Sequence, residues 1–258
     1  MTEFIAPPCA EQISILYQDE HLLLINKPSG LLSLSGKNPL NKDSVHYRLV
    51  QDFPTATLVH RLDFGTSGIM LVALNKTING QLTKQFQDKT INKRYHAVLH
   101  GHLSDELQSL GAINAAITKD VDNFPYMKIC SDTGKQALTE FEVIEESFVN
   151  ANANVGASIN TNTNTNTNTN TNTNTNTNTK KSEQKVPVTR VKFTPITGRT
   201  HQLRIHSQHI GHPILGCDLY RNAISETLAS RLLLHASYLS FTHPVTGIRF
   251  EIDCDIPF

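Results

Sequence analysis

The chain has 258 residues, of which 38% are apolar, and its 23 basic side chains are balanced by 23 acidic ones. This composition is ordinary for a globular protein with a sizeable core, and a neutral chain can hold a polyanion only through a local basic patch. The four cysteines form no CxxC pair, which favours a reduced, cytoplasmic protein over a disulfide scaffold or a zinc ribbon. The first ten residues do not resemble a signal peptide and no segment reaches transmembrane length, so no contact with a membrane is expected.

Short strands and amphipathic helices are predicted through the first hundred residues, after a flexible N-terminal tail at 1–12. Asp43 or Ser44 can cap the first helix, and Pro54 follows its apolar stripe as a stop signal. The predicted elements of this half are strands at 13–17 and 22–25, helices at 45–53 and 77–89, and a strand at 95–99.

The second half of the chain contains a polar insertion between two predicted strands. From Asn160 to Thr179, Thr and Asn alternate without a break, so this tract has nothing apolar to bury and cannot repay the entropy of ordering. We interpret residues at about 150–185 as a disordered insertion in a loop; the alternative is an arm that contacts a polyanion through the lysines that follow. The predicted elements are strands at 136–144 and 186–194, a turn and helix within 197–211, and closing strands at 232–235, 238–242 and 248–252.

The stretch from Val59 to Asn75 places a carboxylate in a turn at the edge of a predicted sheet. Asp63 is followed by Gly65 and Gly68, which let a backbone pass closely and leave the carboxylate accessible. Such a residue can be a reactive group that faces a ligand. It can equally cap its own turn, as Asp commonly does before Gly, Thr and Ser.

Arg199 is predicted to lie where the last helix begins. A cation at that end opposes the positive end of the helix dipole, at a cost of some tenths of a kilocalorie per mole, unless an anion is close by. Arg199 is therefore expected to face a negative charge.

A run of histidines in the same region raises the alternative of a metal site. No HExxH pairing occurs, and neither a cysteine nor a clustered carboxylate completes a ligand set, so no metal is expected. No phosphate-cradling or dinucleotide-binding loop is present, which argues against a nucleotide cofactor. The histidines in question are His201, His206, His209 and His212.

Two basic groups could bind RNA, although such groups are often only solvated faces. Aromatic and histidine residues are interleaved with them, as in Tyr95 next to Arg94, which fits the stacking and phosphate contacts of RNA recognition. The first group is Lys84, Lys89, Lys93 and Arg94, and the second is Arg190, Lys192, Arg199 and Arg204.

Six motifs occur in one order and together resemble the RluA family of pseudouridine synthases. The resemblance runs from about residue 13 to 258, and only the Thr and Asn repeat has no counterpart in it. It implies one catalytic domain without the S4-type RNA-binding module that precedes it in many members. The motifs are LLLINKPSGLLS at 22–33, HRLDFGTSG at 60–68, KRYHAVLHGH at 93–102, TPITGRTHQLRIH at 194–206, GHPILG at 211–216 and RLLLHA at 231–236.

The resemblance implies isomerisation of uridine to pseudouridine without cofactor, metal or energy source. Asp63 matches the family nucleophile, Arg199 the arginine that pairs with it, and Tyr95 the aromatic residue that stacks on the target base. Arg61 matches a residue that fills the gap left by the flipped nucleotide. The other expected RNA contacts are His60, Thr66, Lys93, Arg94, His201, Arg204 and Leu234.

The expected fold is α+β, with a mixed, mostly antiparallel sheet, flanking helices and a central catalytic cleft. The expected substrates are a uridine in a tRNA anticodon loop and one in a hairpin loop of 23S rRNA, because unpaired bases turn out cheaply. We expect a monomer. Two alternatives stay open, a non-catalytic RNA-binding module in which Asp63 is structural and a metal-dependent hydrolase.

One position departs from the family pattern. Many members have an acidic residue directly after the second glycine of the GHPILG motif, where this chain has Cys217 and then Asp218. This puts a local turn contact in doubt but not the chemistry. Leu233, Leu234 and His235 match a segment that lines the family cleft, although for the leucines an ordinary core strand would look the same.

Overall fold

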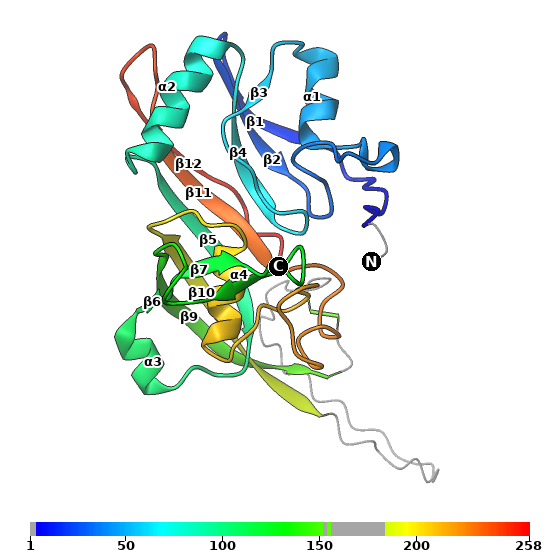
Figure 1. Cartoon of the computed structure of the whole chain (residues 1–258), viewed down its shortest axis with the longest axis vertical. Helices are drawn as coiled ribbons and strands as arrows, with labels where there is room; N and C mark the ends of the chain where they lie inside the picture. The colour runs from blue at the N-terminus through cyan, green and yellow to red at the C-terminus, as the bar shows by residue number, and fades with distance from the viewer. Residues whose placement is uncertain (1–3, 152–153, 156–183) are drawn as a thin grey trace, which may run out of the picture.

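A computed structural model describes residues 4–151, 154–155 and 184–258 (Figure 1). The Thr and Asn repeat, and with it most of the predicted insertion, lies outside these residues. Residues 4–12 form no helix or strand but contact the domain, in contrast to the flexible tail expected. Ala6 N donates to Asn41 Oδ1, and Arg48 donates to the carbonyl oxygens of Cys9 and Glu11. No helix in the described ranges is long and apolar enough to cross a membrane.

A ten-stranded sheet runs through the molecule in the order β1-β2-β4-β11-β5-β10-β9-β6, with β3 paired to β4 and β12 to β11. Only β4 and β11 pair in parallel; every other pair in this sheet is antiparallel. The predicted α+β fold with a mixed, mostly antiparallel sheet is confirmed. The strands are β1 (Ser14–Gln18), β2 (Leu22–Lys27), β3 (Thr57–Leu58), β4 (Ser67–Ala73), β5 (Asn92–His100), β6 (Ala112–Asn114), β9 (Leu138–Asn150), β10 (Lys185–Pro195), β11 (Leu234–Thr242) and β12 (Arg249–Asp253).

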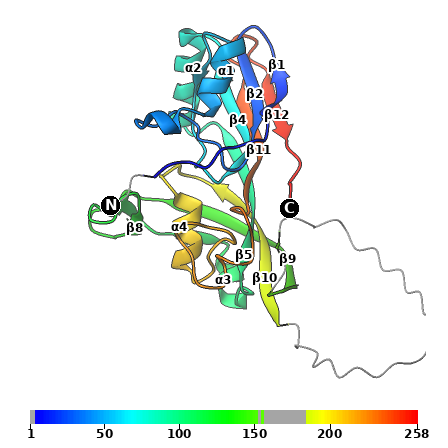
Figure 2. The ribbon, with the colours of Figure 1, turned by 90° about the vertical axis from the view of Figure 1, so that its right-hand side faces the viewer.

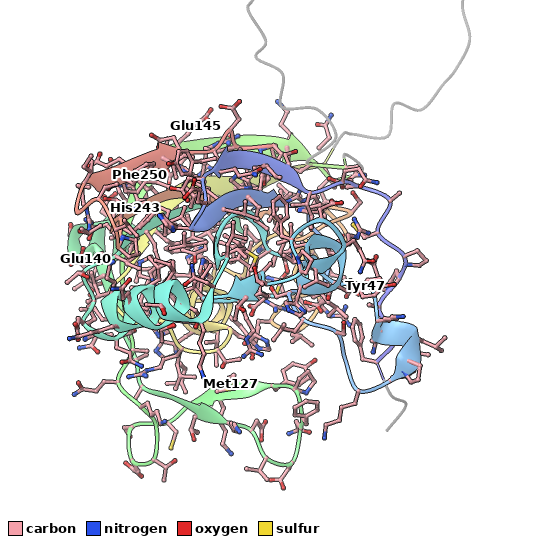
Figure 3. The ribbon with its side chains drawn as sticks, turned by 90° about the horizontal axis from the view of Figure 1, so that it is seen from above. Tyr47, Met127, Glu140, Glu145, His243 and Phe250 are labelled. Atoms are coloured by element: carbon pink, nitrogen blue, oxygen red, sulfur yellow. The ribbon has the colours of Figure 1, made fainter. Side chains whose placement is uncertain are left out.

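A separate hairpin of β7 (Ile117–Lys119) and β8 (Met127–Ile129) projects from the body of the domain, as the position of Met127 in Figure 3 shows. Four α-helices and one 3-10 helix occur in the described chain. They are η1 (Pro39–Asn41), α1 (Val45–Asp52), α2 (Lys76–Gln87), α3 (Asp105–Leu110) and α4 (Gln202–His209).

Local sequence signals account for the helices α1 and α2. Ser44 Oγ accepts a hydrogen bond from Tyr47 N and caps α1, so of the two predicted candidates, Asp43 and Ser44, the serine is the cap. Asn75 Oδ1 accepts from Ile78 N in the same way at the start of α2. The predicted pairing of the strands around the insertion is also confirmed, because β9 and β10 are antiparallel partners.

Three features differ from the sequence expectation. The strands predicted at 232–235 and 238–242 are a single strand, β11, whose pairing with β5 shifts register between Ala236 and Tyr238. This bulge breaks the alternating pattern and explains why the sequence suggested two strands. The strand after Asp63, β4, lies inside the sheet between β2 and β11 and not at an edge. The helix α3 and the β7–β8 hairpin were not predicted.

The core has an upper and a lower part in the view of Figure 1, and the sheet runs through both. In the upper part every residue of β4 is buried, and its alternate side chains join two clusters, one containing residues of α2 and the other residues of α1. In the lower part, β5 and β10 pack against Leu203 and Ile205 of α4. Figure 2 shows α4 below α1 and α2, beside the same run of strands. The loop that carries Asp63 belongs to the upper part and α4 to the lower one.

Candidate active site

A cavity of about 500 Å³ lies where the two parts of the core meet. Its walls come from the loop before β4, from β5, from the segment between β10 and α4, from α4 itself and from β11. The structure therefore brings together all but one of the site residues predicted from sequence. Those that line the cavity are His60, Arg61, Asp63, Thr66, Lys93, Tyr95, Arg199, His201, Arg204 and Leu234.

The turn that carries Asp63 is held by hydrogen bonds to its backbone. Thr66 N donates to Asp63 O at 3.1 Å, and Ser29 Oγ donates to Gly65 O at 2.7 Å. Lys27 Nζ donates to Phe64 O at 3.1 Å. Because these bonds fix three successive carbonyl groups, they hold the backbone that carries the carboxylate. Its side chain is 29% exposed, so the cavity can reach it.

Lys27 was not singled out from the sequence, yet it is fully buried beneath this turn. Its ammonium also donates to Pro28 O at 2.8 Å. Burial lowers the pKa of Lys27 to about 7, even though Cys9 and Asp63 nearby act in the opposite direction. A lysine at the end of a strand that begins with four apolar residues was the signal in the sequence that could have identified it.

Arg204 is the guanidinium that pairs with Asp63. Its Nη1 lies 3.4 Å from Asp63 Oδ2, its Nη2 pairs with Asp218, and its Nε donates to Cys217 Sγ at 3.4 Å. The side chain is only 4% exposed. Burial by itself would lower the pKa of Arg204, but the surrounding Cys217, Asp63 and Asp218 raise it overall. A buried, permanently charged guanidinium can hold the carboxylate beside it in a fixed direction.

The expectation that Arg199 pairs with Asp63 is therefore wrong for this structure. The helix α4 begins at Gln202, so Arg199 lies in the loop before it and not at the end of the dipole. Its backbone N donates to Gln202 Oε1 at 2.9 Å, and its Nε donates to Gln136 O at 3.0 Å. Arg199 still lines the cavity, as an exposed residue of the rim.

The alternative that Asp63 merely caps its own turn is not favoured by its contacts. In the described part of the chain, its carboxylate pairs with Arg204 and accepts no hydrogen bond from the turn itself. Arg204 sits between Leu203 and Ile205 on a helix whose residues 202–207 are all buried. A charged residue inside such a run was the signal for a buried ion pair.

Tyr95 and Lys93 reach the cavity from the same face of β5, because alternate side chains of a strand point the same way. Burial, and then the negative charge of Asp63, raise the pKa of Tyr95, so the phenol keeps its proton at neutral pH. Burial also lowers the pKa of Lys93. The aromatic ring can serve as a platform for a planar ligand beside the carboxylate.

Arg94 is the predicted site residue that does not line this cavity. It lies between Lys93 and Tyr95 on β5 and so points to the other face of the sheet. There its guanidinium lies over the ring of Tyr238, 4.1 Å from the centroid. Arg94 is therefore not part of this cavity, and its expected contact with RNA stays a prediction.

His60 forms part of the cavity wall as a neutral residue. Its Nε2 accepts a hydrogen bond from Leu71 N at 3.0 Å, and its ring is tilted against Phe86 at 4.8 Å between centroids. Burial, and then the positive charge of Lys93, lower the pKa of His60 to about 3. Arg61 is exposed at the mouth, whereas Thr66 and Leu234 are buried in the wall.

The histidines of the former metal alternative make separate hydrogen bonds. His201, in the left-handed conformation just before α4, is joined by Nδ1 to Tyr220 Oη at 2.9 Å. His206 is buried and joined to Thr139 Oγ1 and Ala115 O, each at 3.0 Å. His212 Nδ1 is joined to His100 O at 2.9 Å.

The segment after α4 supplies residues that sequence reasoning did not assign to the site. Asp218 pairs with Arg204, and Cys217, at the position that departs from the family pattern, contacts the same guanidinium. Tyr220 is buried, and burial raises its pKa to about 12. Its hydroxyl accepts from Met127 N at 2.7 Å and so connects the β7–β8 hairpin to the floor of the cavity.

The site thus presents a carboxylate held by a buried arginine, beside an aromatic ring, with further cations among the residues that line the same cavity. A carboxylate held in this way can act as a nucleophile, and the rim can hold a polyanion. Together with the mixed sheet, this arrangement is that of an enzyme acting on nucleic acid. The family model for RNA pseudouridylate synthases matches residues 21–209, so the chain belongs to this family.

Curated relatives agree with this assignment along nearly the whole chain. A dual-specificity RNA pseudouridine synthase RluA of Yersinia pestis is 41% identical over 95% of this chain and 99% of its own length. The protein of the same name from Escherichia coli K12 is 39% identical over 93% of this chain and 92% of its own. The predicted family is confirmed, and the chain is a pseudouridine synthase, an isomerase that modifies RNA. The non-catalytic alternative is not favoured.

Solved structures show the same fold. Human RNA pseudouridylate synthase domain containing 1 superposes with a TM-score of 0.69 at 28% identity, covering 98% of this chain and 86% of that one. Human RNA pseudouridylate synthase domain containing 4 superposes with a TM-score of 0.61 at 21% identity, covering 95% and 88% respectively, and supports the fold alone.

Proposed function

We propose that this chain converts a uridine of a tRNA anticodon loop and a uridine of a 23S rRNA hairpin loop to pseudouridine, with Asp63 as the nucleophile. The observation that carries the proposal is the ion pair of Asp63 with the buried Arg204 at the floor of a cavity lined by Tyr95. The dual specificity is supported by the name of the relatives, which are 38–41% identical to this chain.

In the proposed reaction the bond between N1 of uracil and C1′ of ribose breaks, the base rotates, and a bond forms between C5 and C1′. C5 loses its proton and N1 gains one, so the product is an isomer and no oxidant or energy source is consumed. Asp63 assists by attack on the ribose or on the base, since both routes need the same ionised carboxylate. Arg204 positions this carboxylate.

The remaining assignments follow from where each side chain meets the cavity. Tyr95 provides the ring on which the detached base stacks while it turns, and its retained proton can be donated in a hydrogen bond. Arg61, exposed at the mouth, fills the gap left in the RNA when the nucleotide flips out. Loop uridines suit such a site because they are not held by pairing.

The decisive experiment is to map pseudouridines in total tRNA and rRNA from cells that lack this protein. Complementation with the wild type should restore sites in both RNAs. Asp63→Asn should restore none, because an amide is not a nucleophile. Asp218→Asn is the matched control: it also removes one carboxylate from Arg204 but leaves Asp63 in place, so it should restore the sites with a reduced rate.

The outcomes separate the parts of the proposal. Full restoration by Asp63→Asn would overturn the nucleophile assignment. Sites that are lost in one RNA alone would overturn dual specificity and keep the chemistry.

We infer that the protein works in the cytoplasm, where tRNA and rRNA are modified. We also infer one catalytic domain, from residue 13 to residue 258. We expect the protein to be a monomer, which sedimentation of the pure protein tests.

A further inference from the structure

A second cavity, of about 360 Å³, adjoins the active cavity. Its volume is within the range of pockets that hold small ligands. It is bounded by the end of α2, the start of β5 and the segment after β10. The two cavities share six lining residues and are therefore contiguous: Phe86, Lys93, Pro195, Thr197, Gly198 and Arg199.

The charged residues that line this second cavity in the described chain are all positive. Lys89, Lys93 and Arg199 line it, and among the described residues that do so none carries a carboxylate. Within the same described ranges, none of the three forms a salt bridge. The proposed catalytic cavity lies directly beside this concentration of unpaired cations.

Two basic residues elsewhere on the sheet do have acidic partners. Arg190 lies 3.8 Å from Glu145, and Lys192 pairs with Glu142, so two cations of β10 are neutralised by carboxylates of the neighbouring β9. The absence of acidic partners in the second cavity is thus a local property and not that of every basic residue of the domain. An anionic ligand is the partner that such a cavity lacks.

Lys93 stands at the junction of the two cavities. A Cβ on Gly198 would be 3.7 Å from Lys93 Nζ, and the ammonium lies 5.8 Å from the centroid of the Phe86 ring. Half-buried between an aromatic ring and a glycine backbone, the ammonium loses part of its hydration without gaining a counterion. A phosphate placed at the junction would replace that lost hydration, and the missing side chain of Gly198 leaves room for it.

We propose that the second cavity binds the sugar-phosphate of the nucleotide next to the target uridine, with Lys93 on the shared phosphodiester and Lys89 and Arg199 on the next backbone oxygens. This inference rests on the proposed function, because it takes the first cavity as the place of the target base. Contacts of this kind fix the register of the RNA and do not read its sequence. They determine how tightly the RNA binds and not how fast the bond is broken.

The test uses the full chain and a synthetic RNA hairpin with one reactive loop uridine. Lys89→Gln, Lys93→Gln and Arg199→Gln each remove a charge and keep a long polar side chain. Each should raise KM about tenfold and leave kcat within about twofold, since one charged phosphate contact is lost. Lys76→Gln, on the exposed start of the same helix α2 and in neither cavity, is the matched control and should leave KM unchanged.

The position of the nucleotide is tested with hairpins in which one phosphodiester beside the target is replaced by a neutral methylphosphonate. With the wild type, one such replacement should raise KM as much as Lys93→Gln does. With Lys93→Gln, the same replacement should have no further effect, because the contact is already gone. Additive losses would overturn the assignment of Lys93 to that phosphate.

The outcomes distinguish the two proposals. A wild type that fails to convert the hairpin and cellular RNA alike would overturn the proposed function. A wild type that converts it, with Lys93→Gln and Lys76→Gln showing the same KM, would overturn only the second cavity as a subsite. A fall in kcat without a rise in KM would overturn it too. Melting curves of the variants identify any that are misfolded, and for those the methylphosphonate effects in the wild type decide.

Discussion

The floor and the rim of the active cavity differ in whether their cations have acidic partners. On the floor, Arg204 is buried and has both Asp63 and Asp218 as partners. On the rim, Lys93 and Arg199 have no salt-bridge partner in the described part of the chain. The cation of the floor therefore has its counterions within the protein, whereas the cations of the rim can gain counterions from the phosphates of RNA. A site of this kind separates the chemical step from the capture of the substrate.

The two regions also differ in how solvent acts on them. An ion pair whose guanidinium is buried is screened less than an exposed one, and loss of its carboxylates would leave the buried charge of Arg204 uncompensated. The cations of the rim, of which Arg199 is exposed and Lys93 half-buried, are open to screening by salt and contribute mostly through the counterions that bound RNA releases. Changes to the floor should alter turnover and stability, and changes to the rim should alter binding and its salt dependence.

Of the changes considered, Arg204→Gln should have the largest effect on turnover and stability, because it leaves Asp63 without its buried partner. We expect kcat to fall about 100-fold or more and the free energy of unfolding to fall by about 1–3 kcal/mol, because the carboxylates left behind still reach solvent. Single-turnover kinetics and urea unfolding measure both quantities. Arg204→Lys should recover part of kcat, since it keeps the charge. If Arg199→Gln lost kcat and Arg204→Gln did not, the original assignment of Arg199 would be restored.

The neutral histidine of the wall should make stability depend on pH. Because the folded pKa of His60 is lowered to about 3, the unfolded chain binds more protons between pH 6.5 and pH 3, and stability falls as the pH drops through this window. Burial also lowers the pKa of His235 to about 4, so it acts in the same direction.

Urea unfolding at pH 7.5 and pH 5.5 measures this dependence. His60→Gln keeps an acceptor for Leu71 N and should make the loss of stability at pH 5.5 smaller by about 1 kcal/mol. The exposed His209→Gln is the control variant. An equal pH dependence in the wild type and His60→Gln would contradict a neutral, buried role for His60.

Salt titration should separate the rim from the floor more finely. Each phosphate contact on single-stranded RNA contributes about 0.7 to the slope of log KM against log salt, so the triple variant at Lys89, Lys93 and Arg199 should lower that slope by about 2. Tyr95→Phe keeps the ring on the floor and should leave the slope unchanged. Equal slopes for the triple variant and the wild type would show that the rim does not bind phosphates.

Deletion of residues 160–179 should have the smallest effect. The strands on either side, β9 and β10, pair along their length up to Asn150 and Lys185, and loop closure depends only weakly on loop length. We expect turnover within about twofold of the wild type and a change in unfolding free energy of about 1 kcal/mol or less. A large loss of turnover with intact folding would favour the alternative of an arm that contacts RNA.

Much of the local structure and the family could be predicted from the sequence. The cap at Ser44 and the apolar periodicity of α1 and α2 act within one turn of chain, so sequence neighbours suffice to predict them. The ordered motifs led to the family and to Asp63 and Tyr95, which do meet in one cavity. Motif recognition works here because the motifs are contiguous in sequence.

Only the tertiary structure decided which charges meet. Arg199 and Arg204 belong to one motif, and the start of α4 at Gln202 left the first in a loop and buried the second against Asp63. The strand alternation of β5 turned Lys93 into the cavity and Arg94 away from it. The physical reason is that an ion pair depends on distance and burial, and residues far apart in sequence acquire both only when the sheet and α4 pack together.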